Sequence, residues 1–459
     1  MERISGRRFV VAGAGVSGLA LTRFLLERGG EVTLSDSRSE GLGPEVAEAG
    51  RRGARLELGG HDEARFAEAD QVLVSPGVPL GLPALRAARG AGVPVWGEIE
   101  FASRFLTGKI LGITGTNGKS TTTTLTARLL VEGGVDAVAC GNLGTPLIDQ
   151  VAADSPARHY VLELSSFQLE GIEAFRPDLA VLLNVAPDHQ DRYASHADYL
   201  SAKARIFENQ RDGDQALLNR DDPEANAFTG RIAARTRHFS RLESVEDGAC
   251  VESGRIVLRA GGRSREVMPA GEVPLVGIHN LENVLASVAA AGLCGVEPRT
   301  MAATLREFRG LPHRLELVAE IEGVRYYNDS KATNVAATAK SLESFPSGVI
   351  LILGGKDKGG DFASLVPLIR ERAAGVVFMG KARDSIRAQV GEPVPSRVVV
   401  SLAEAIAAAR EMASAGQVVL LAPGCASFDA YRSFEERGDD FKDRVLALAG
   451  KPGTRGGGR

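Results

Sequence analysis

Thr114-Gly115-Thr116-Asn117-Gly118-Lys119-Ser120 is a glycine-containing turn between an apolar run, Lys109–Ile113, and a helical pattern, Thr121–Val131. Such a turn lets backbone N–H groups approach phosphate oxygens, and the N-terminus of the following helix favours negative charge. Lys119 can reach the outer phosphates, while the Ser120 hydroxyl can bind Mg²⁺. The segment therefore predicts a parallel α/β sheet with a nucleotide-phosphate site at the end of one strand.

The turn departs from the strict pattern G-x-x-x-x-G-K-[ST] at one position. The first glycine of that pattern belongs at position 113, which is Ile113, and the nearest glycines are Gly112 and Gly115. The alternative interpretation is an ordinary turn between a strand and a helix. Because both flanking elements are present, the pattern favours a variant phosphate-binding loop.

Short apolar runs alternate with helical patterns along the rest of the chain, which is typical of parallel α/β sheets. Single cores stop growing at roughly 250–300 residues, so 459 residues need more than one. We expect three consecutive α/β domains, 1–98, 99–310 and 311–450, and a disordered Gly-rich tail, 451–459. The expected strands are Phe9–Ala12, Glu31–Ser35, Gln71–Ser75, Val93–Trp96, Lys109–Ile113, Tyr160–Leu164, Leu179–Asn184, Val349–Leu353, Gly375–Met379, Arg397–Val400 and Gln417–Leu421. The expected helices include Leu19–Arg28, Leu82–Gly90, Asn280–Gly292, Met301–Phe308 and Leu402–Met412.

Composition excludes several classes of protein. Hydrophobic residues at 44% and charged residues at 24% are typical of folded globular chains, and a net charge of -4 disfavours nucleic-acid or membrane-surface partners. The four cysteines show no metal-ligand spacing, which favours reduced thiols and disfavours a zinc site. No signal-peptide core or membrane span is recognisable, so we expect a cytoplasmic protein.

A second glycine-rich turn, Gly13–Gly18, follows the first expected strand and has the form G-x-G-x-x-G. Asp36 ends the next strand at the distance at which dinucleotide-binding folds place an acidic residue for the ribose. One interpretation is a nucleotide or sugar-nucleotide site with Asp36, Ser37 or Arg38 available to the base or ribose. The other is a turn needed only for packing of the helix on the strand.

Candidate metal ligands follow two strands of the second domain. Glu163 lies at the end of one strand, and the segment from Asn184 to His189 follows the next. The carboxyl ends of parallel strands meet at one sheet edge, and Mg²⁺ prefers oxygen ligands shared with phosphates. Alternatively, Glu163 is a solvated strand-end carboxylate and His189 an ordinary loop histidine.

Lys203 is predicted to point inward, since its helical neighbours are Tyr199, Leu200, Ile206 and Phe207. Burial lowers a lysine's pKa, and a neutral amine can react with CO₂ to form a carbamate, an oxygen-bearing anion suited to a metal. The alternative is a lysine whose ammonium reaches water along the surface of the helix.

Several segments, in order along nearly the whole chain, resemble the Mur ligase family of cell-wall amino-acid ligases. They are 114–120, Gly141–Gly144, Glu163–Leu169, Asn184–Tyr193, Gly277–Asn280, Leu311–Arg314, Asn328–Asn334 and Ala422–Phe434. The resemblance implies an N-terminal Rossmann-like domain, a central domain with a parallel sheet like that of P-loop ATPases, and a C-terminal Rossmann-like domain.

The resemblance also implies site residues for ATP and magnesium. The ATP contacts would be 114–120 with Thr121, Asn280, Arg314 and Asp329. Ser120, Glu163, His189 and Lys203 would form an environment for two Mg²⁺ ions, with Lys203 at the position that the family carbamylates. Lys119, His189, Lys203 and Lys331 would act in catalysis.

For the other substrates, the resemblance points to addition of D-glutamate to UDP-N-acetylmuramoyl-L-alanine through an acyl phosphate. Val16, Ser17, Asp36 and Ser37 match uridine-binding positions, and Asn142 matches a contact to the muramoyl-alanine part. Thr333, Lys358, Ser427 and Phe434 match positions that hold D-glutamate. The expected partners are small molecules alone, and the expected oligomeric state is a monomer.

Three alternatives stay open at this point. A dehydrogenase would use Gly13–Gly18 for NAD, but would leave the loop around Lys119 unexplained. A non-catalytic nucleotide-binding regulator would bind ATP without turnover. Within the family, a folylpolyglutamate-type or another cell-wall ligase is the nearest competitor, and the segment Cys425–Asp429 favours glutamate addition to the alanyl precursor.

Overall fold

The computed structural model describes residues 3–188, 192–357 and 359–450. The chain folds into two compact units. The first unit holds residues 1–273 and 279–306, and the second holds 274–278 and 307–459. None of the helices in these described ranges has the length and apolarity that a bilayer crossing needs.

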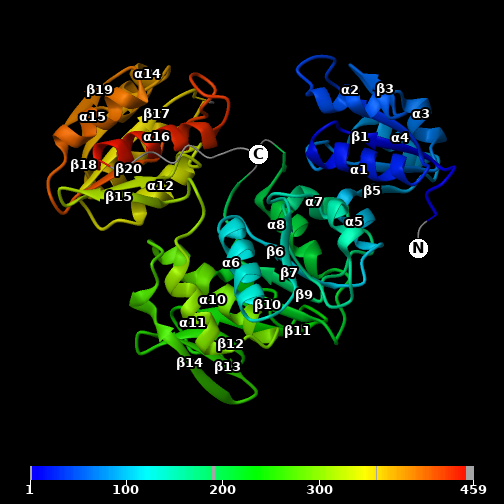
Figure 1. Ribbon diagram of the computed structural model, residues 1–459, viewed down its shortest axis with the longest axis horizontal. Helices are drawn as coiled ribbons and strands as arrows, with labels where there is room; N and C mark the ends of the chain where they lie inside the picture. Colours follow the sequence, from blue (N-terminus) through cyan, green and yellow to red (C-terminus); the bar gives the residue numbers. More distant parts are fainter. Residues whose placement is uncertain (1–2, 189–191, 358, 451–459) are drawn as a thin grey trace. The chain divides into compact units, whose positions relative to one another are not determined.

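The first unit begins with a parallel five-stranded sheet of order β3-β2-β1-β4-β5 (Figure 1). Alternate residues of β1 face opposite sides, so Phe9 and Val11 pack with α1 while Val10 and Ala12 pack with α3 and α4. The strands are β1 (Arg8–Ala12), β2 (Glu31–Asp36), β3 (Arg55–Leu58), β4 (Gln71–Val74) and β5 (Val95–Gly97). The helices are α1 (Val16–Glu27), α2 (Pro44–Arg51), α3 (Glu63–Glu68), α4 (Pro83–Gly90) and α5 (Glu98–Ser103).

The same unit continues into a nine-stranded sheet of order β14-β13-β12-β11-β10-β9-β6-β8-β7. The strands are β6 (Lys109–Thr114), β7 (Ala137–Gly141), β8 (His159–Glu163), β9 (Leu179–Leu182), β10 (Gln215–Asn219), β11 (Arg235–Ser240), β12 (Gly248–Glu252), β13 (Arg255–Ala260) and β14 (Arg263–Pro269). The helices are α6 (Lys119–Glu132), α7 (Ser166–Glu170), α8 (His196–Ala204), α9 (Pro223–Asn226), α10 (Ile278–Leu293) and α11 (Pro298–Glu307). Short 3₁₀ helices are η1 (Leu147–Ala153), η2 (Arg205–Phe207) and η3 (Ala270–Glu272). Strands β6 to β12 pair in parallel, whereas β13 and β14 add an antiparallel edge that the sequence patterns did not predict.

The second unit holds a six-stranded sheet of order β15-β16-β20-β17-β18-β19, in which only the β15–β16 pair among the described residues is antiparallel. The strands are β15 (Glu316–Ile321), β16 (Val324–Asn328), β17 (Val349–Gly354), β18 (Ala373–Met379), β19 (Ser396–Val398) and β20 (Val418–Leu421). The helices are α12 (Val335–Glu343), η4 (Phe362–Leu365), α13 (Val366–Arg372), α14 (Arg383–Val390), α15 (Leu402–Met412) and α16 (Phe434–Leu448).

Strand β17 shows why this domain has helices on both faces of its sheet. Every residue of Val349–Gly354 is buried. Ile350 and Ile352 pack with α15 and α16, while Leu351 and Leu353 pack with α12, α13 and α14. A strand that is apolar on both sides is typical of a parallel sheet with two covered faces, as the sequence predicted.

Glu100 of α5 joins the N-terminal sheet domain to the central one within the first unit. Its side chain is fully buried. Its Oε2 accepts the backbone N–H groups of Glu173, Ala174 and Phe175 at 2.8, 2.9 and 2.7 Å, and Oε1 accepts Arg104 Nε at 2.8 Å. One carboxylate therefore accepts three consecutive backbone N–H groups of a segment that lies between α7 and β9, outside the strands.

We expect Glu100→Ala to lower the free energy of unfolding by about 3–5 kcal/mol, because it leaves buried donors and Arg104 without their acceptor. Urea unfolding of the full chain measures this loss. Glu48→Ala is the control, since Glu48 pairs with Arg51 at the surface. Unfolding of both variants at the same urea concentration would contradict the role assigned to Glu100.

Candidate functional site

The turn between β6 and α6 has the backbone of a phosphate-binding loop. Gly118 has φ +86°, and a Cβ there would lie 2.0 Å from Asn283 Oδ1. Only glycine fits this position without displacing its neighbour. The turn therefore brings its backbone to the N-terminus of α6, where N–H groups at positions 119–121 begin the helix.

Asn184, which lies just after β9, forms hydrogen bonds with the phosphate-binding loop. Its Oδ1 accepts Asn117 N–H at 2.9 Å, its Nδ2 donates to Asn117 O at 3.1 Å, and its carbonyl accepts Thr116 N–H at 2.9 Å. Since β9 pairs in parallel with β6, the two strand ends meet at the same edge. The expected convergence of 114–120 with the segment beginning at Asn184 is confirmed.

Two lysines donate to one carbonyl of this loop. Lys119 Nζ lies 2.9 Å from Gly115 O and 2.9 Å from Thr116 O, and Lys203 Nζ lies 2.8 Å from Gly115 O. Lys203 is 1% exposed, and its Nζ lies 4.5 Å from the centre of the Tyr199 ring. The predicted inward orientation of Lys203 is confirmed.

Burial, reinforced by the charge of Lys119, lowers the pKa of Lys203 to about 6. The amine of Lys203 is therefore mostly neutral at pH 7, which is the form that can act as a nucleophile toward CO₂. A neutral amine still donates a hydrogen bond to Gly115 O.

Glu163 ends β8 beside the loop and is 4% exposed. Its Oε1 accepts Asn142 Nδ2 at 2.7 Å, while its Oε2 is buried without a hydrogen-bond partner. Ser120, also buried, is the second residue of α6, which follows the neighbouring strand β6. A buried carboxylate oxygen without a partner suits Mg²⁺, which needs few protein ligands when phosphates and water supply the rest.

No group of three or more His, Cys, Asp or Glu side chains within the described ranges is arranged to hold a metal by itself. His189, predicted as a further ligand, lies outside the described residues.

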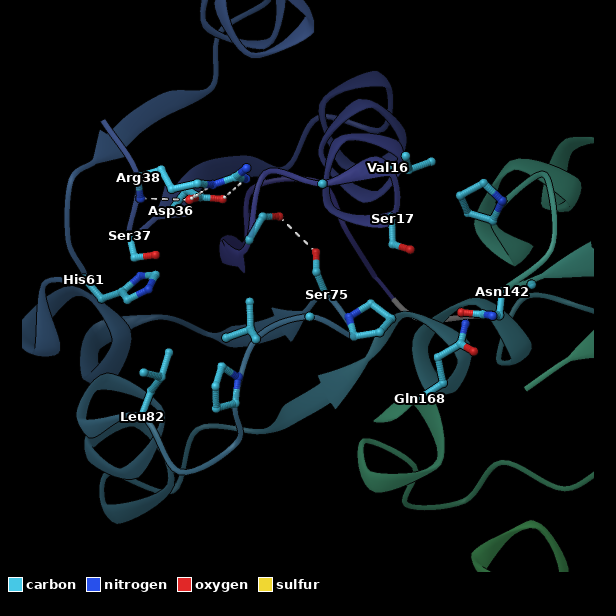
Figure 2. A pocket seen from close by; sticks show the side chains of 18 of the residues that line it. Val16, Ser17, Asp36, Ser37, Arg38, His61, Ser75, Leu82, Asn142 and Gln168 are labelled. Carbon is cyan, nitrogen blue, oxygen red and sulfur yellow. Dashed lines mark hydrogen bonds and ion pairs between the residues drawn. The ribbon is translucent and has the colours of Figure 1, made fainter. Parts of the chain in front are cut away.

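A cavity of about 510 Å³ opens where the N-terminal sheet meets the central domain (Figure 2). Asp36 accepts Ala14 N–H at 2.8 Å, Arg38 N–H at 2.9 Å and the Arg38 guanidinium at 2.9 Å. The Arg38 side chain holds the pKa of Asp36 well below its usual range, so Asp36 is an anion. The predicted residues Val16, Ser17, Asp36, Ser37 and Asn142 all line this cavity.

Sequence patterns missed other residues around these sites. His61 and Gln168 line the cavity, and His61 Nδ1 lies 2.8 Å from Ser35 Oγ. Asn283 Oδ1 accepts Thr122 Oγ1 of α6 at 3.3 Å, and Asn283 Nδ2 donates to Asn280 Oδ1 at 3.1 Å. Its spacing of three residues from Asn280 on one helix was the available indication.

In the second unit, the predicted residues follow the carboxyl ends of β16 and β20. Asp329 is buried and accepts Ser341 Oγ, and burial raises the pKa of Asp329 to about 6. Lys331 Nζ lies 4.0 Å from the centre of the Phe434 ring. Thr333 follows in the same loop, Ser427 lies buried after β20, and Arg314 precedes β15. Lys358 lies outside the described residues.

Comparison with known families matches three consecutive segments of the chain. The N-terminal domain of MurD-like Mur ligases matches residues 7–97, the Mur ligase middle domain matches 113–291, and the Mur ligase glutamate ligase domain matches 313–425. Proteins named UDP-N-acetylmuramoylalanine–D-glutamate ligase are similar over almost their whole length. The one from Acidobacterium capsulatum is 46% identical over 450 residues, 97% of this chain and 98% of that protein. The one from Geobacter metallireducens is 46% identical over 446 residues, with the same two coverages.

Solved structures share the fold at low sequence identity. UDP-N-acetylmuramate-alanine ligase MurC from Thermotoga maritima has a TM-score of 0.58 at 19% identity, covering 96% of this chain and 99% of that one. A pseudomurein peptide ligase type C from Methanothermus fervidus has a TM-score of 0.55 at 20% identity, covering 91% and 96%. Both likenesses show the fold alone.

Lys203→Met tests the buried amine, because methionine fills similar space without a charge to desolvate. The pKa of Lys203 is about 6 in the native state and 10.5 in the unfolded chain. At a pH between these two values, the unfolded chain binds one more proton at Lys203 than the native state does. The free energy of unfolding therefore increases as the pH rises through this range. We expect Lys203→Met to stabilise the protein by roughly a few kcal/mol near pH 6 and by progressively less toward pH 10. Unfolding in CO₂-free buffers at several pH values measures the difference. A gain that is independent of pH would contradict the lowered pKa.

Proposed function

Because this chain belongs to the Mur ligase family, we propose that it joins D-glutamate to UDP-N-acetylmuramoyl-L-alanine with hydrolysis of ATP to ADP and phosphate. The enzyme is an ATP-dependent ligase of peptidoglycan precursor synthesis. We assign the sugar nucleotide to 1–98, ATP to 99–310 and the amino acid to 311–450. Its substrates are small molecules that occur in the cytoplasm, where we place the enzyme as a monomer.

The contact between Asn142 and Glu163 is the observation that carries this proposal. Asn142 lines the cavity assigned to the sugar nucleotide. Its side-chain amide donates a hydrogen bond to Glu163, the carboxylate beside the phosphate loop. A sugar nucleotide whose uridine lies at Asp36 would extend its carboxylate end toward Asn142. The acceptor carboxylate and the ATP phosphates would then meet near Glu163.

The proposed reaction has two steps. An oxygen of the alanyl carboxylate attacks the γ-phosphorus of ATP, the bond to the β-phosphate oxygen breaks, and ADP leaves with that electron pair. The amine of D-glutamate then attacks the acyl carbon, loses a proton and expels phosphate. Acyl phosphates are reactive toward amines, so the first step supplies the free energy for the amide bond.

The chain's own groups would stabilise charge during the first step. Backbone N–H groups of 114–120 and the Lys119 ammonium would neutralise the transferring phosphoryl group, with Thr121, Asn280, Arg314 and Asp329 as further ATP contacts. Ser120, Glu163, Lys203 and, from the sequence, His189 would hold two Mg²⁺ ions, which would supply further neutralisation of the phosphate oxygens. Lys331 and His189 would orient the acyl phosphate.

Lys203 would serve as a carbamate. The neutral nitrogen attacks the carbon of CO₂, forms an N–C bond and releases a proton, which leaves an anion with two oxygens. The lowered pKa of Lys203 supports this assignment, since an ammonium cannot react in this way. Uridine would be held by Val16, Ser17, Asp36 and Ser37, and D-glutamate by Thr333, Lys358, Ser427 and Phe434.

The decisive assay measures phosphate release from ATP in the presence of UDP-N-acetylmuramoyl-L-alanine. We expect release with D-glutamate at a rate at least about a hundredfold above that with L-glutamate, L-lysine or diaminopimelate. The enantiomer cannot place its amine and both carboxylates on the same protein groups at once, L-lysine lacks the second carboxylate, and diaminopimelate is longer, so each leaves polar groups of the site unpaired. Lys119→Ala is the negative control. Equal release with L-glutamate, or hydride transfer with NAD in place of phosphate release, would overturn the assignment.

The carbamate at Lys203 can be observed directly. With ¹³C-labelled bicarbonate, we expect the wild-type protein to show a carbamate ¹³C resonance that Lys203→Ala lacks. Loss of this anion should slow phosphate release at least about a hundredfold, because a metal environment then loses a charged ligand. Lys340→Ala, which removes a surface lysine paired with Glu343, should keep both the resonance and the rate. A Lys203→Ala variant with full activity would exclude the carbamate role.

A further inference from the structure

Arg437 is a charged side chain with almost no exposure to solvent. It lies near the start of α16 and is 1% exposed. Its Nε donates to Ser330 Oγ and its Nη2 to Ser330 O, both at 2.9 Å. Its Nη1 and Nη2 each donate to Cys425 O at 3.2 Å. These acceptors are all neutral, and burial lowers the pKa of Arg437 to about 10. Packing alone does not explain a buried arginine, because an apolar side chain would avoid the desolvation.

The two residues that Arg437 contacts belong to different loops. Ser330 lies in the loop after β16, three residues before Thr333, and Cys425 lies in the loop after β20, two residues before Ser427. One guanidinium therefore connects two loops that each carry a residue assigned to D-glutamate.

The connection reaches two further segments. Ser330 Oγ, which accepts from Arg437, donates to Phe434 O at 2.8 Å, and so connects the start of α16 to the loop after β16. A Cβ on Gly355, in the loop after β17, would lie 3.2 Å from Arg437 Nη1. That loop pairs with the one after β20, since Lys356 N–H donates to Ala426 O at 2.9 Å and Ala426 N–H donates to Lys356 O at 3.1 Å.

We propose that Arg437 is a positioning residue for the amino-acid substrate, because it holds in one arrangement the segments that carry Thr333, Ser427 and Phe434. The inference rests on the proposed function, in which these residues bind D-glutamate. A small dicarboxylate held by side chains from separate segments needs those segments fixed to within about 0.5 Å. Arg437 fixes these segments by donating hydrogen bonds to the Ser330 hydroxyl and to the backbone oxygens of Ser330 and Cys425, without touching the ligand.

A lysine cannot reproduce this arrangement. The guanidinium presents donors from three nitrogens in a rigid plane, so it can reach Ser330 and Cys425 together. A lysine keeps the charge but donates from one nitrogen at the end of a flexible chain. Arg437→Lys should therefore loosen the loops without removing positive charge from the domain.

The test uses the full chain and the phosphate-release assay. We expect Arg437→Lys to raise the KM for D-glutamate at least about tenfold, while the KM values for ATP and for UDP-N-acetylmuramoyl-L-alanine stay within about twofold. Added methylguanidinium should lower the raised KM for D-glutamate of Arg437→Ala. Arg444→Lys is the matched control, since Arg444 lies on the same helix and pairs with Asp440 at the surface.

An unchanged KM for D-glutamate in Arg437→Lys overturns the inference. Equal rises in all three KM values, accompanied by a lower thermal unfolding temperature, overturn it as well, because they indicate a purely structural role. If Arg437→Lys does not fold, Ser330→Ala carries the same test, since it removes only the hydroxyl between Arg437 Nε and Phe434 O. A wild-type enzyme without D-glutamate-dependent phosphate release defeats the proposed function itself, and this result is separate from any result on the variants.

Discussion

The carbonyl of Gly115 accepts hydrogen bonds from Lys119 and from Lys203, which approach it from two different helices. Two ammonium groups at one oxygen repel each other, and Lys203 is also cut off from water. Burial, and next to it the charge of Lys119, therefore lowers the pKa of Lys203 well below its usual range. The proposed carbamate depends on this unequal pair, because it needs a neutral amine beside the loop.

Parallel sheet topology explains how residues far apart in sequence reach this point. Strands β6, β8 and β9 are neighbours, so their carboxyl ends meet at one edge: Thr114 ends β6, Glu163 ends β8 and Asn184 follows β9. The contact of Asn142 with Glu163 extends this edge to the cavity at the N-terminal sheet. In the second unit, candidate site residues also follow the carboxyl ends of parallel strands: Asp329 follows β16 and Ser427 lies in the loop after β20. The candidate site residues thus lie at strand ends and in the loops that follow, while the buried strands hold these segments in place.

Much of the fold was predictable because the strands are short apolar runs with clear helical patterns between them. Helix Leu402–Met412 was predicted with the bounds that the structure gives, and the inward side of Lys203 followed from its helical neighbours. The antiparallel strands β13 and β14 were not predicted. Exposed charged residues interrupt the strand pattern of Arg263–Pro269, whereas Arg255–Ala260 holds only a short buried apolar run, Ile256–Leu258. The local alternation of apolar and polar residues does not predict which strands pair with each other in a sheet.

The phosphate loop, the α/β class and the family could be predicted before any coordinates, because each depends on residue types at fixed short spacings. Three features emerged from the packing: Glu163 Oε2 is left without a hydrogen-bond partner, Glu100 caps a distant turn, and Arg437 joins two loops. These facts depend on contacts between residues separated by many positions, and on whether water is excluded there. The sequence pattern of α16 would place Arg437 at the surface, because arginine is usually exposed in an amphipathic helix. The packing of the neighbouring loops buries it instead.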